Sequence, residues 1–347
     1  MSKKIKIGLW EIEASEKEYF QEALKEYSLV FSSEKIDKNQ LPQENDFDII
    51  SLFICSKIQK EVLAHFPNLK LITTRSTGLD HINAEECQKR GIKVANVPVY
   101  GDNTVAEHTF ALILNLSRKI FKSFDQIKET GSFSLKGLQG FDLKGKTLGV
   151  VGTGNIGRCV IRIAHGFQMK ILAFDPYSNQ DLTKELKFQY LKSLEELLTQ
   201  SDIVTLHLPL NTQTKHLINR DNIYKMKKGA LLINTARGGI VETEALLKAL
   251  KEGHLAGAGL DVLEGEKSLQ DELEIFTSDK YGIYDLVEGY QTKEEDLKVL
   301  IQNRLLCDLE NVIITPHNAF NSKEALQRIR ETTVDNIKSF IFQLETK

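Results

Sequence analysis

Lys146-Thr-Leu-Gly-Val-Val-Gly152-Thr-Gly154-Asn-Ile-Gly157 is the stretch that decides the fold of this chain. An apolar run leads into its first marked glycine, and a helical pattern leaves the last one. In this G-x-G-x-x-G arrangement, Gly152 allows a tight turn, Gly154 lets the backbone approach a pyrophosphate, and Gly157 lets the helix pack close to the strand. Amides at the positive end of the helix dipole would hold the phosphates. The stretch therefore predicts a dinucleotide-binding domain.

The acid that follows the next predicted strand indicates which dinucleotide is bound. Residues 170–174 form an apolar run, and Asp175 comes directly after it. An acid about 20 residues past the glycines accepts a hydrogen bond from the ribose 2′-hydroxyl. The same carboxylate repels a 2′-phosphate, and residues 176–179 contain no Arg or Lys to bind one. Taken alone, Asp175 would be a turn residue before a proline; beside the glycines, it favours NAD over NADP.

Short apolar runs alternate with amphipathic stretches on both sides of this motif, which is typical of parallel sheets with crossover helices. We therefore expect an α/β chain with doubly wound parallel sheets. The expected strands cover residues 5–9, 48–53, 69–74, 94–97, 146–151, 170–174, 203–207, 230–234, 256–261 and 313–315. The expected helices cover residues 16–27, 84–90, 103–121, 155–167, 193–199, 220–226, 242–252 and 323–342.

Three stretches differ from the rest of the chain in length or composition. Residues 103–121 are the longest helical pattern before the middle of the chain, with Asn103 or Thr104 as the expected N-cap. Residues 130–143 look like a linker or an exposed arm. Residues 266–309 are acidic and polar, which predicts a surface insertion with some helix.

Length and composition bound the class of protein. At roughly 100–200 residues per domain, 347 residues suggest two domains, with three as the alternative. The hydrophobic fraction of 41% and charged fraction of 27% are ordinary for globular chains. A net charge of -3 gives no basic surplus for nucleic acid or an anionic membrane. We find no apolar run near the roughly 20 residues of a membrane span.

The cysteines and the first residues indicate the compartment. Cys55, Cys87, Cys159 and Cys307 are scattered and form no C-x-x-C pair, so we expect neither a disulfide framework nor a metal site. We expect all four to be small buried side chains in a reducing cytoplasm. Residues 1–8 lack the apolar core and cleavage site of a secretory signal.

Several further segments agree in order and spacing with one known family. Together with the glycine motif, they resemble the D-isomer-specific 2-hydroxyacid dehydrogenase family over nearly the whole chain except residues 267–309. Their details look most like the D-lactate dehydrogenase branch. The segments are Arg75-Ser-Thr-Gly-Leu-Asp-His-Ile, Asn96-Val-Pro-Val-Tyr100, Asn103-Thr-Val-Ala-Glu-His, His207-Leu-Pro-Leu, Ile233-Asn-Thr-Ala-Arg237-Gly-Gly, Gly259-Leu-Asp261-Val-Leu-Glu-Gly-Glu266 and Thr315-Pro-His317-Asn-Ala-Phe320.

The resemblance implies an NAD-dependent enzyme that interconverts a small 2-oxo acid and its D-2-hydroxy acid. It implies a Rossmann NAD-binding domain, residues 103–317, inserted in a flavodoxin-like substrate domain formed by residues 1–102 and 318–347. The substrate would lie in the cleft between the domains, and closure would exclude water. Members are commonly homodimers through the NAD domain, so residues 104–121 and 130–143 are the candidate interface.

Three residues match the catalytic positions of that family. Arg237 offers a planar guanidinium that can grip the carboxylate and carbonyl oxygens of a 2-oxo acid. His317 matches the general acid/base, which protonates the carbonyl oxygen in reduction and takes the hydroxyl proton in oxidation. Glu266 matches the carboxylate that pairs with this histidine and favours its charged form. Singly, each would be an ordinary structural or surface residue; their joint occurrence at strand ends supports a site.

The resemblance also assigns binding residues. Thr77 and Gly78 match the loop whose amides hold the substrate carboxylate, and Arg75 and Tyr100 look like pocket neighbours. Phe320 would cover the substrate side chain, although Tyr100 and Phe320 are equally well explained as core aromatics. We interpret His108 as a helix-face or interface residue. Besides the three glycines and Asp175, the NAD site would be lined by Asn155, Ile156, Leu208, Pro209, Thr214, Thr235, Ala236 and Asp261, with His207 beside it.

The substrate stays open at this point. Residues 266–317 are longer than is typical for the family, and Asn318 leaves the D-lactate pattern partly unmatched. Pyruvate is the first choice, with hydroxypyruvate, glyoxylate or a branched 2-oxo acid as alternatives. A phosphoglycerate enzyme is disfavoured, because the sequence has no obvious basic phosphate cluster and no C-terminal regulatory domain. A non-catalytic NAD(H)-sensing protein and an enzyme of cell-wall or antibiotic-resistance precursors remain rival functions on the same scaffold.

Overall fold

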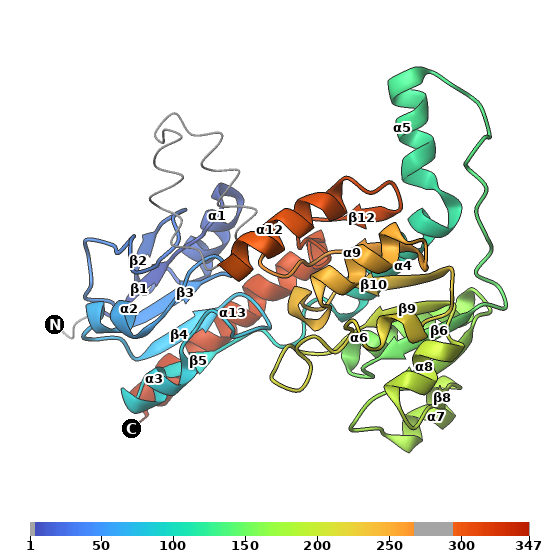
Figure 1. The fold of residues 1–347 in the computed structure, drawn as a ribbon. Helices are drawn as coiled ribbons and strands as arrows, with labels where there is room; N and C mark the ends of the chain where they lie inside the picture. The colour runs from blue at the N-terminus through green and yellow to red at the C-terminus, as the bar shows by residue number, and fades with distance from the viewer. Residues whose placement is uncertain (1–3, 267–293, 347) are drawn as a thin grey trace. The chain divides into compact units, whose positions relative to one another are not determined.

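A computed structural model describes residues 4–266 and 294–346 of the chain. It divides into two compact units. Unit 1 comprises Met1–Tyr100 and Asn321–Lys347, and unit 2 comprises Gly101–Phe320. Each unit is built on its own parallel sheet (Figure 1).

Unit 1 contains a five-stranded parallel sheet in the order β2-β1-β3-β4-β5. This is the flavodoxin-like order, in which the chain direction across the sheet reverses between β1 and β3. The predicted doubly wound fold is confirmed here. The strands are β1 Lys6–Leu9, β2 Ser28–Phe31, β3 Ile49–Leu52, β4 Leu71–Thr74 and β5 Lys93–Ala95.

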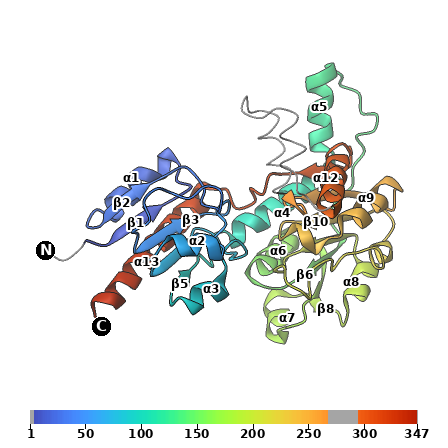
Figure 2. The same cartoon turned by 60° about the vertical axis from the view of Figure 1, so that its left-hand side comes forward.

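Helices cover both faces of this sheet, which explains why β3 and β4 are buried throughout. The first core cluster joins the sheet to α1 (Ala14–Ala23) and to α13 (Lys323–Glu345), so the C-terminal helix packs on unit 1. Figure 2 shows α13 beside this sheet. The second cluster joins the opposite face to α2 (Lys60–His65) and α3 (Ala84–Lys89).

Unit 2 contains a seven-stranded parallel sheet in the order β12-β11-β10-β9-β6-β7-β8. The chain starts in the middle at β6, adds β7 and β8 on one side, and then adds β9 to β12 on the other. This is the Rossmann arrangement, whose ligands bind where the order reverses, between β6 and β9. The strands are β6 Thr147–Val151, β7 Lys170–Phe174, β8 Gln189–Tyr190, β9 Ile203–Leu206, β10 Ala230–Asn234, β11 Leu255–Leu260 and β12 Val312–Ile314.

The helices of unit 2 also form two layers. One core cluster packs α4 (Asp102–Arg118), α6 (Asn155–Gly166) and α7 (Gln180–Leu186) on one face of the sheet. The other packs α8, α9 and α12 on the opposite face, together with the short turn η1. In Figure 1, α5 extends away from the sheet of this unit. The remaining bounds are α5 Ile120–Thr130, α8 Leu194–Gln200, η1 Ile223–Lys225, η2 Gly238–Ile240, α9 Thr243–Lys251 and α12 Glu294–Cys307.

The predicted helix over residues 103–121 is wrong at both ends. Its N-cap is Gly101 rather than Asn103 or Thr104. Lys119 takes a left-handed backbone, φ 54°, and its amide donates to the carbonyl of Asn115, which ends α4. Helix α5 begins at the next residue. Ile120 and Phe121, which the prediction placed in the same helix, therefore belong to a separate one.

Shorter elements escaped prediction. The sequence pattern missed β2, α2, α7 and β8, and residues 220–226 form only the single turn η1. These elements are too short to display a period of 2 or 3.6 residues clearly. In the segment 266–309, α12 confirms the predicted helix, and residues 267–293 lie outside the described residues.

The cysteine prediction holds in part. The four cysteines, all in the described part of the chain, are free thiols. Cys87 is buried, but Cys55 and Cys307 are exposed and Cys159 is intermediate, so the expectation of four buried side chains is wrong. Among the described residues, no helix is both long enough and apolar enough to cross a membrane.

Candidate active site

His317 and Glu266 form a close pair in unit 2. Nδ1 of His317 lies 2.7 Å from Oε1 of Glu266. A carboxylate only accepts hydrogen bonds, so Nδ1 carries the proton and donates it. This leaves Nε2 as the nitrogen that takes up or releases a proton. Both side chains are partly exposed, 29% for His317 and 40% for Glu266, so a small molecule can reach them.

Asp261 fixes the loop that carries His317. Its buried carboxylate accepts hydrogen bonds from the amides of Asn318 and Ala319, each at 3.0 Å, and from the hydroxyl of Thr315. The amide of His317 donates to the backbone carbonyl of Asp261 at 2.8 Å. Asp261 therefore holds four residues of the loop; the NAD contact expected for it stays a prediction.

A histidine of α4 contacts the same loop. Nε2 of His108 lies 3.0 Å from Oγ1 of Thr315 and 3.5 Å from Oδ1 of Asp261. The next residue, Thr109, exchanges a hydrogen bond with Thr235 at 3.0 Å. Of the two readings kept open for His108, the internal helix-face role fits these contacts. Sequence reasoning missed its link to the His317 loop, because neither spacing nor residue type marks it.

Arg237 follows β10, two strands away from β12 in the same sheet. The strand β11 between them leads into Asp261 and Glu266. The three candidate catalytic residues thus follow three adjacent parallel strands, at their carboxyl edge. The half-buried guanidinium of Arg237 donates to the carbonyl of Ala236 at 2.8 Å, and Asn234 Nδ2 donates to the carbonyl of Arg237 at 2.9 Å. Hydrogen bonds among its own residues therefore stabilise the turn after β10.

The glycine motif has the geometry of a dinucleotide loop. Gly152 has φ +95°, and a Cβ there would lie 2.5 Å from the carbonyl oxygen of His207. A Cβ on Gly157 would lie 2.1 Å from the carbonyl oxygen of Gly152, so helix and turn touch. A Cβ on Gly154, the N-cap of α6, would meet only open space. The loop thus leaves room for a pyrophosphate in front of the α6 N-terminus, and these residues fit NAD.

Asp175 lies at the end of β7 and contacts the glycine loop directly. Oδ2 accepts hydrogen bonds from the amide of Thr153 at 2.8 Å and from its hydroxyl at 2.9 Å. Oδ1 accepts from the amide of Tyr177 at 2.8 Å. The hydroxyl of Tyr190 lies 2.7 Å from that of Thr153. Asp175 is thus held on two sides, so its position relative to the loop is fixed.

His207, after β9, is kept neutral by its surroundings. Burial lowers the pKa of His207 to about 3. Its Nε2 lies 2.9 Å from Oγ1 of Thr205, and its Nδ1 is covered and lacks a hydrogen-bond partner in the described part of the chain. The ring therefore stays uncharged throughout the physiological range.

The remaining residues predicted for the NAD site lie on the same edge of unit 2. Asn155 and Ile156 begin α6, and Leu208 and Pro209 continue from β9. The hydroxyl of Thr214 donates to the carbonyl of Pro209 at 2.6 Å, which closes that loop. Thr235 and Ala236 lie between β10 and Arg237.

Arg75 in unit 1 is placed differently from a pocket residue. Its side chain is buried, and its guanidinium donates to the carbonyls of Trp10 at 2.9 Å and Glu11 at 2.6 Å. A third contact reaches Ser51 Oγ at 3.3 Å. Burial lowers the pKa of Arg75. These bonds give Arg75 a structural role, joining the ends of β1, β3 and β4, while its predicted substrate contact stays a prediction.

The loop after β4 is also internally braced. The hydroxyl of Thr77 donates to the carbonyl of Val97 at 3.0 Å, and Ser76 Oγ donates to the carbonyl of Gly78 at 2.8 Å. Tyr100, the last residue of this part of unit 1, accepts a hydrogen bond at its carbonyl from Arg328 Nε. Phe320 belongs to unit 2, where its Cβ lies close to Gly101.

Glu11 is a further polar residue at the edge of the unit 1 sheet that the sequence did not reveal. It has φ 55°, in the left-handed region. Its carboxylate accepts hydrogen bonds from the amides of Phe53 at 3.0 Å, Cys55 at 2.8 Å and Ser56 at 3.2 Å. It therefore fixes the loop after β3, beside the point where the strand order reverses. A lone acid after a strand gives no signal for this role.

Comparison with known proteins agrees with this geometry. Residues 110–319 match the family model described as "D-isomer specific 2-hydroxyacid dehydrogenase, NAD binding domain". A glyoxylate reductase of Thermofilum pendens is 39% identical over 296 residues, 84% of this chain and 78% of that protein.

Two solved structures resemble the whole chain. A D-lactate dehydrogenase from Aquifex aeolicus, complexed with NAD and lactic acid, has a TM-score of 0.82 and 38% identity, and the match covers 97% of this chain and 96% of that one. The pyruvate reductase of Chlamydomonas reinhardtii has a TM-score of 0.84 and 33% identity, with 98% and 97% covered.

Proposed function

Because the chain belongs to the D-isomer specific 2-hydroxyacid dehydrogenases, NAD-dependent oxidoreductases of small 2-hydroxy or 2-oxo acids, we propose that it interconverts pyruvate and D-lactate. The observation that carries this proposal is the pair formed by His317 and Glu266, 2.7 Å apart. Arg237 follows a strand of the same sheet edge. A 2-oxo acid needs a proton donor and a cation, and these side chains supply both.

In reduction, His317 donates its Nε2 proton to the carbonyl oxygen while Glu266 holds the other ring nitrogen. Arg237 grips the substrate carboxylate and polarises the carbonyl. In oxidation, the neutral ring takes the hydroxyl proton. When bound, NAD(H) supplies or accepts the hydride at C2. The hydrogen bonds that the Asp261 carboxylate accepts from the amides of Asn318 and Ala319 support this assignment, because they hold the backbone that carries the ring.

We assign the two units different roles. Unit 2 carries the glycine loop, so its residues 103–317 bind NAD, with Asp175 on the adenine ribose. Unit 1 supplies Thr77 and Gly78, whose backbone amides hold the substrate carboxylate. Arg75 stabilises the strands below this loop. Tyr100 and Phe320 contact the substrate side chain.

Pyruvate stands first because the sequence details resemble the D-lactate branch, and glyoxylate is the alternative. The solved relative from Aquifex aeolicus is named a D-lactate dehydrogenase, whereas the relative from Thermofilum pendens is named a glyoxylate reductase. Steady-state NADH oxidation with pyruvate, glyoxylate, hydroxypyruvate and 2-oxoisocaproate separates them. We expect the highest kcat/KM with pyruvate. A higher value with another acid would identify that acid as the substrate. Tight NADH binding without turnover of any of these acids would indicate an NAD(H)-sensing protein.

We also propose a homodimer formed through unit 2. No side chain of α5, which the structure describes throughout, is buried. Its apolar residues Phe121, Phe124 and Ile127 are 55%, 58% and 45% exposed. On the following arm, Phe133 and Leu135 are 86% and 84% exposed. An apolar surface of this kind supports a protein contact, and a second copy is the partner that the family suggests.

A cytoplasmic location is the last part of the proposal. The four cysteines, all within the described residues, are free thiols, which suits a reducing compartment. Cell fractionation with an antibody against the protein tests it. Recovery of the protein outside the cytoplasmic fraction would reject this location.

A further inference from the structure

The segment that carries Glu266 holds a second histidine–glutamate pair. Two residues earlier, Oε1 of Glu264 lies 2.6 Å from Nε2 of His216. The proposed catalytic pair has a similar separation of 2.7 Å. The histidines of both pairs have left-handed backbones, φ 50° for His216 and 52° for His317. The function proposed above uses Glu266 and leaves Glu264 without a role.

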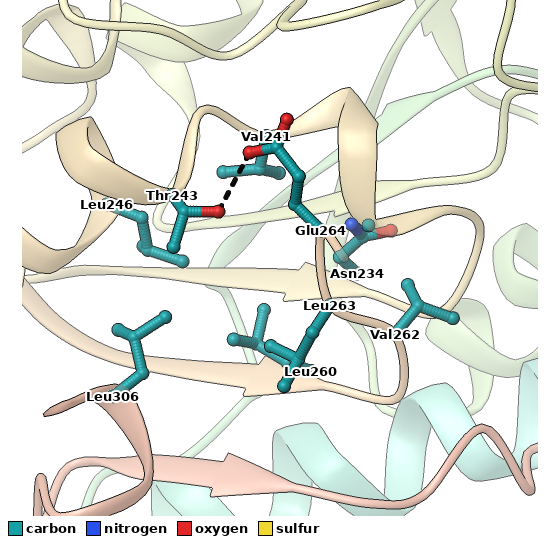
Figure 3. A pocket seen from close by; sticks show the side chains of 10 residues that line it. Asn234, Val241, Thr243, Leu246, Leu260, Val262, Leu263, Glu264 and Leu306 are labelled. Carbon is teal, nitrogen blue, oxygen red and sulfur yellow. Dashed lines mark hydrogen bonds between the residues drawn. The ribbon is translucent and has the colours of Figure 1, made fainter. Parts of the chain in front are cut away.

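Glu264 is anchored to two helices as well as to His216. Its second carboxylate oxygen accepts a hydrogen bond from Oγ1 of Thr243, the first residue of α9, at 2.9 Å (Figure 3). Its backbone carbonyl accepts from Nδ2 of the buried Asn303 on α12 at 2.7 Å. The Glu264 side chain is 21% exposed, against 40% for Glu266. Glu264 is therefore the better fixed of the two acids.

The backbone beside Glu264 packs directly on the residue that follows Arg237. A Cβ on Gly238 would lie 2.0 Å from the carbonyl carbon of Leu263, a distance that no real contact allows. The cavity at this contact has a volume of ≈ 10 Å³, which admits about one water molecule. Figure 3 shows the side chains around it. The backbone at Leu263 and Glu264 thus lies against the turn that carries Arg237 and leads directly to Glu266.

We propose that Glu264 and His216 are positioning residues for the dehydrogenase reaction. The pair clamps residues 263–266, and so keeps the carboxylate of Glu266 on Nδ1 of His317. We assign neither residue a contact with substrate or cofactor. The inference rests on the proposed function, because it concerns the acid/base pair of that reaction.

Of the two acids near His216, Glu264 is the one that pairs with it. Glu242 lies on the neighbouring turn, and its carboxylate accepts hydrogen bonds from the amide and side chain of Arg220. Arg220, and to a smaller extent His216, lower the pKa of Glu242. Glu242 is therefore already paired with a permanent cation.

Loss of the clamp has a consequence that a merely structural role would not have. When Glu266 is no longer held on the ring, the charged imidazolium loses a stabilising partner. Reduction requires the protonated ring, so the alkaline limb of its pH profile moves to lower pH. A purely structural role would lower the melting temperature and leave the limb in place.

The first test is the pH profile of kcat/KM for pyruvate reduction in Glu264→Gln and His216→Gln. We expect the alkaline limb to move down by about one pH unit, with KM for NADH within about twofold of wild type. Glu244→Gln is the matched control, because it removes the same charge from an α9 residue whose partner is Lys298 of α12. The control should keep the wild-type limb.

The second test does not depend on turnover. Ring signals of His317, followed by NMR against pH, should titrate at lower pH in both variants than in wild type. Inactivity of the wild type would reject the proposed function, whereas the ring titration would still decide the positioning role. If Glu264→Gln does not fold, His216→Gln decides, because its side chain is 36% exposed. Unchanged titration in a folded His216→Gln would overturn the proposal.

Discussion

The backbone of His317 has a strained conformation. Its φ of 52° lies in the left-handed region, which costs a non-glycine residue roughly 1–2 kcal/mol. Hydrogen bonds from its amide to the carbonyl of Asp261, and from the next two amides to the Asp261 carboxylate, hold it there. Strain retained at the cost of stability is common where a side chain must be aimed.

Replacement of this ring should abolish most of the activity. We expect His317→Ala to lower kcat about 100-fold or more, the scale of a general acid/base. His317→Asn is the second variant, because asparagine tolerates the left-handed region better than alanine. Equal losses in both variants attribute the effect to the ring rather than to the loop. Stopped-flow or steady-state NADH oxidation measures it, and a rate within tenfold of wild type would remove His317 from the mechanism.

We expect Asp175 to set the choice between NADH and NADPH. We expect Asp175→Ala to narrow the preference for NADH, because the variant no longer repels a 2′-phosphate. Asp175 also binds Thr153, so Thr153→Val is the control: it removes the hydroxyl's hydrogen bonds to Asp175 and Tyr190 and keeps the Asp175 charge. The ratio of kcat/KM for the two cofactors is the measurement. An unchanged ratio in Asp175→Ala would mean that the ribose contact lies elsewhere.

His207 should make the fold sensitive to acid. Burial lowers the pKa of His207 to about 3, from an ordinary value of 6.5. Between these pH values the unfolded chain binds a proton that the folded chain does not, so stability falls as the pH drops below about 6.5. We expect wild type to lose more free energy of unfolding between pH 7 and pH 5 than His207→Gln. Urea unfolding at both pH values tests this, and equal losses would contradict it.

Contacts within one copy of the chain do not explain the apolar surface of helix α5. Its apolar side chains face solvent, which is unfavourable for a helix that stays alone. We expect Phe124→Glu to convert a dimer into a monomer, measured by sedimentation velocity. Gln200→Glu adds the same charge on the exposed surface of α8 and should remain dimeric. A monomeric wild type, or a dimeric Phe124→Glu, would contradict the proposed interface.

Elements with strict local requirements could be predicted from the sequence. The turn between β6 and α6 requires glycine at 152 for its positive φ of 95° and at 157 for contact with the carbonyl of Gly152, and both are local requirements that the motif reveals. The end of α4 could not be predicted, because Ile120 and Phe121 continue the apolar pattern beyond the left-handed Lys119. Helical periodicity records which side chains are apolar, and it does not record where the backbone turns.

The candidate site divides in the same way. The pairing of His317 with Glu266 follows from residue types that a known family uses. The bonds made by Asp261 and Glu11 mostly go to backbone amides, and every residue but proline has one, so no sequence pattern marks them. The structural role of Arg75 was missed for a related reason, because its acceptors include the backbone carbonyls of residues more than sixty positions away.

At the scale of the whole molecule, both units place polar residues after the carboxyl ends of parallel strands. In unit 1, Glu11 follows β1 and Arg75 follows β4. In unit 2, Asp175, His207 and Asp261 follow β7, β9 and β11. Ligands of open α/β sheets bind at this edge. In each unit, polar residues therefore lie at the sheet edge where ligands of such folds bind.

We expect this chain to reduce a 2-oxo acid stereospecifically with NADH. The most direct measurement is NADH oxidation at 340 nm with pyruvate, followed by chiral analysis of the lactate formed. We expect one lactate per NADH oxidised, all of it the D-isomer, and a rate lowered about 100-fold or more with His317→Ala. L-lactate, a racemic product, or full activity without His317 would contradict the account.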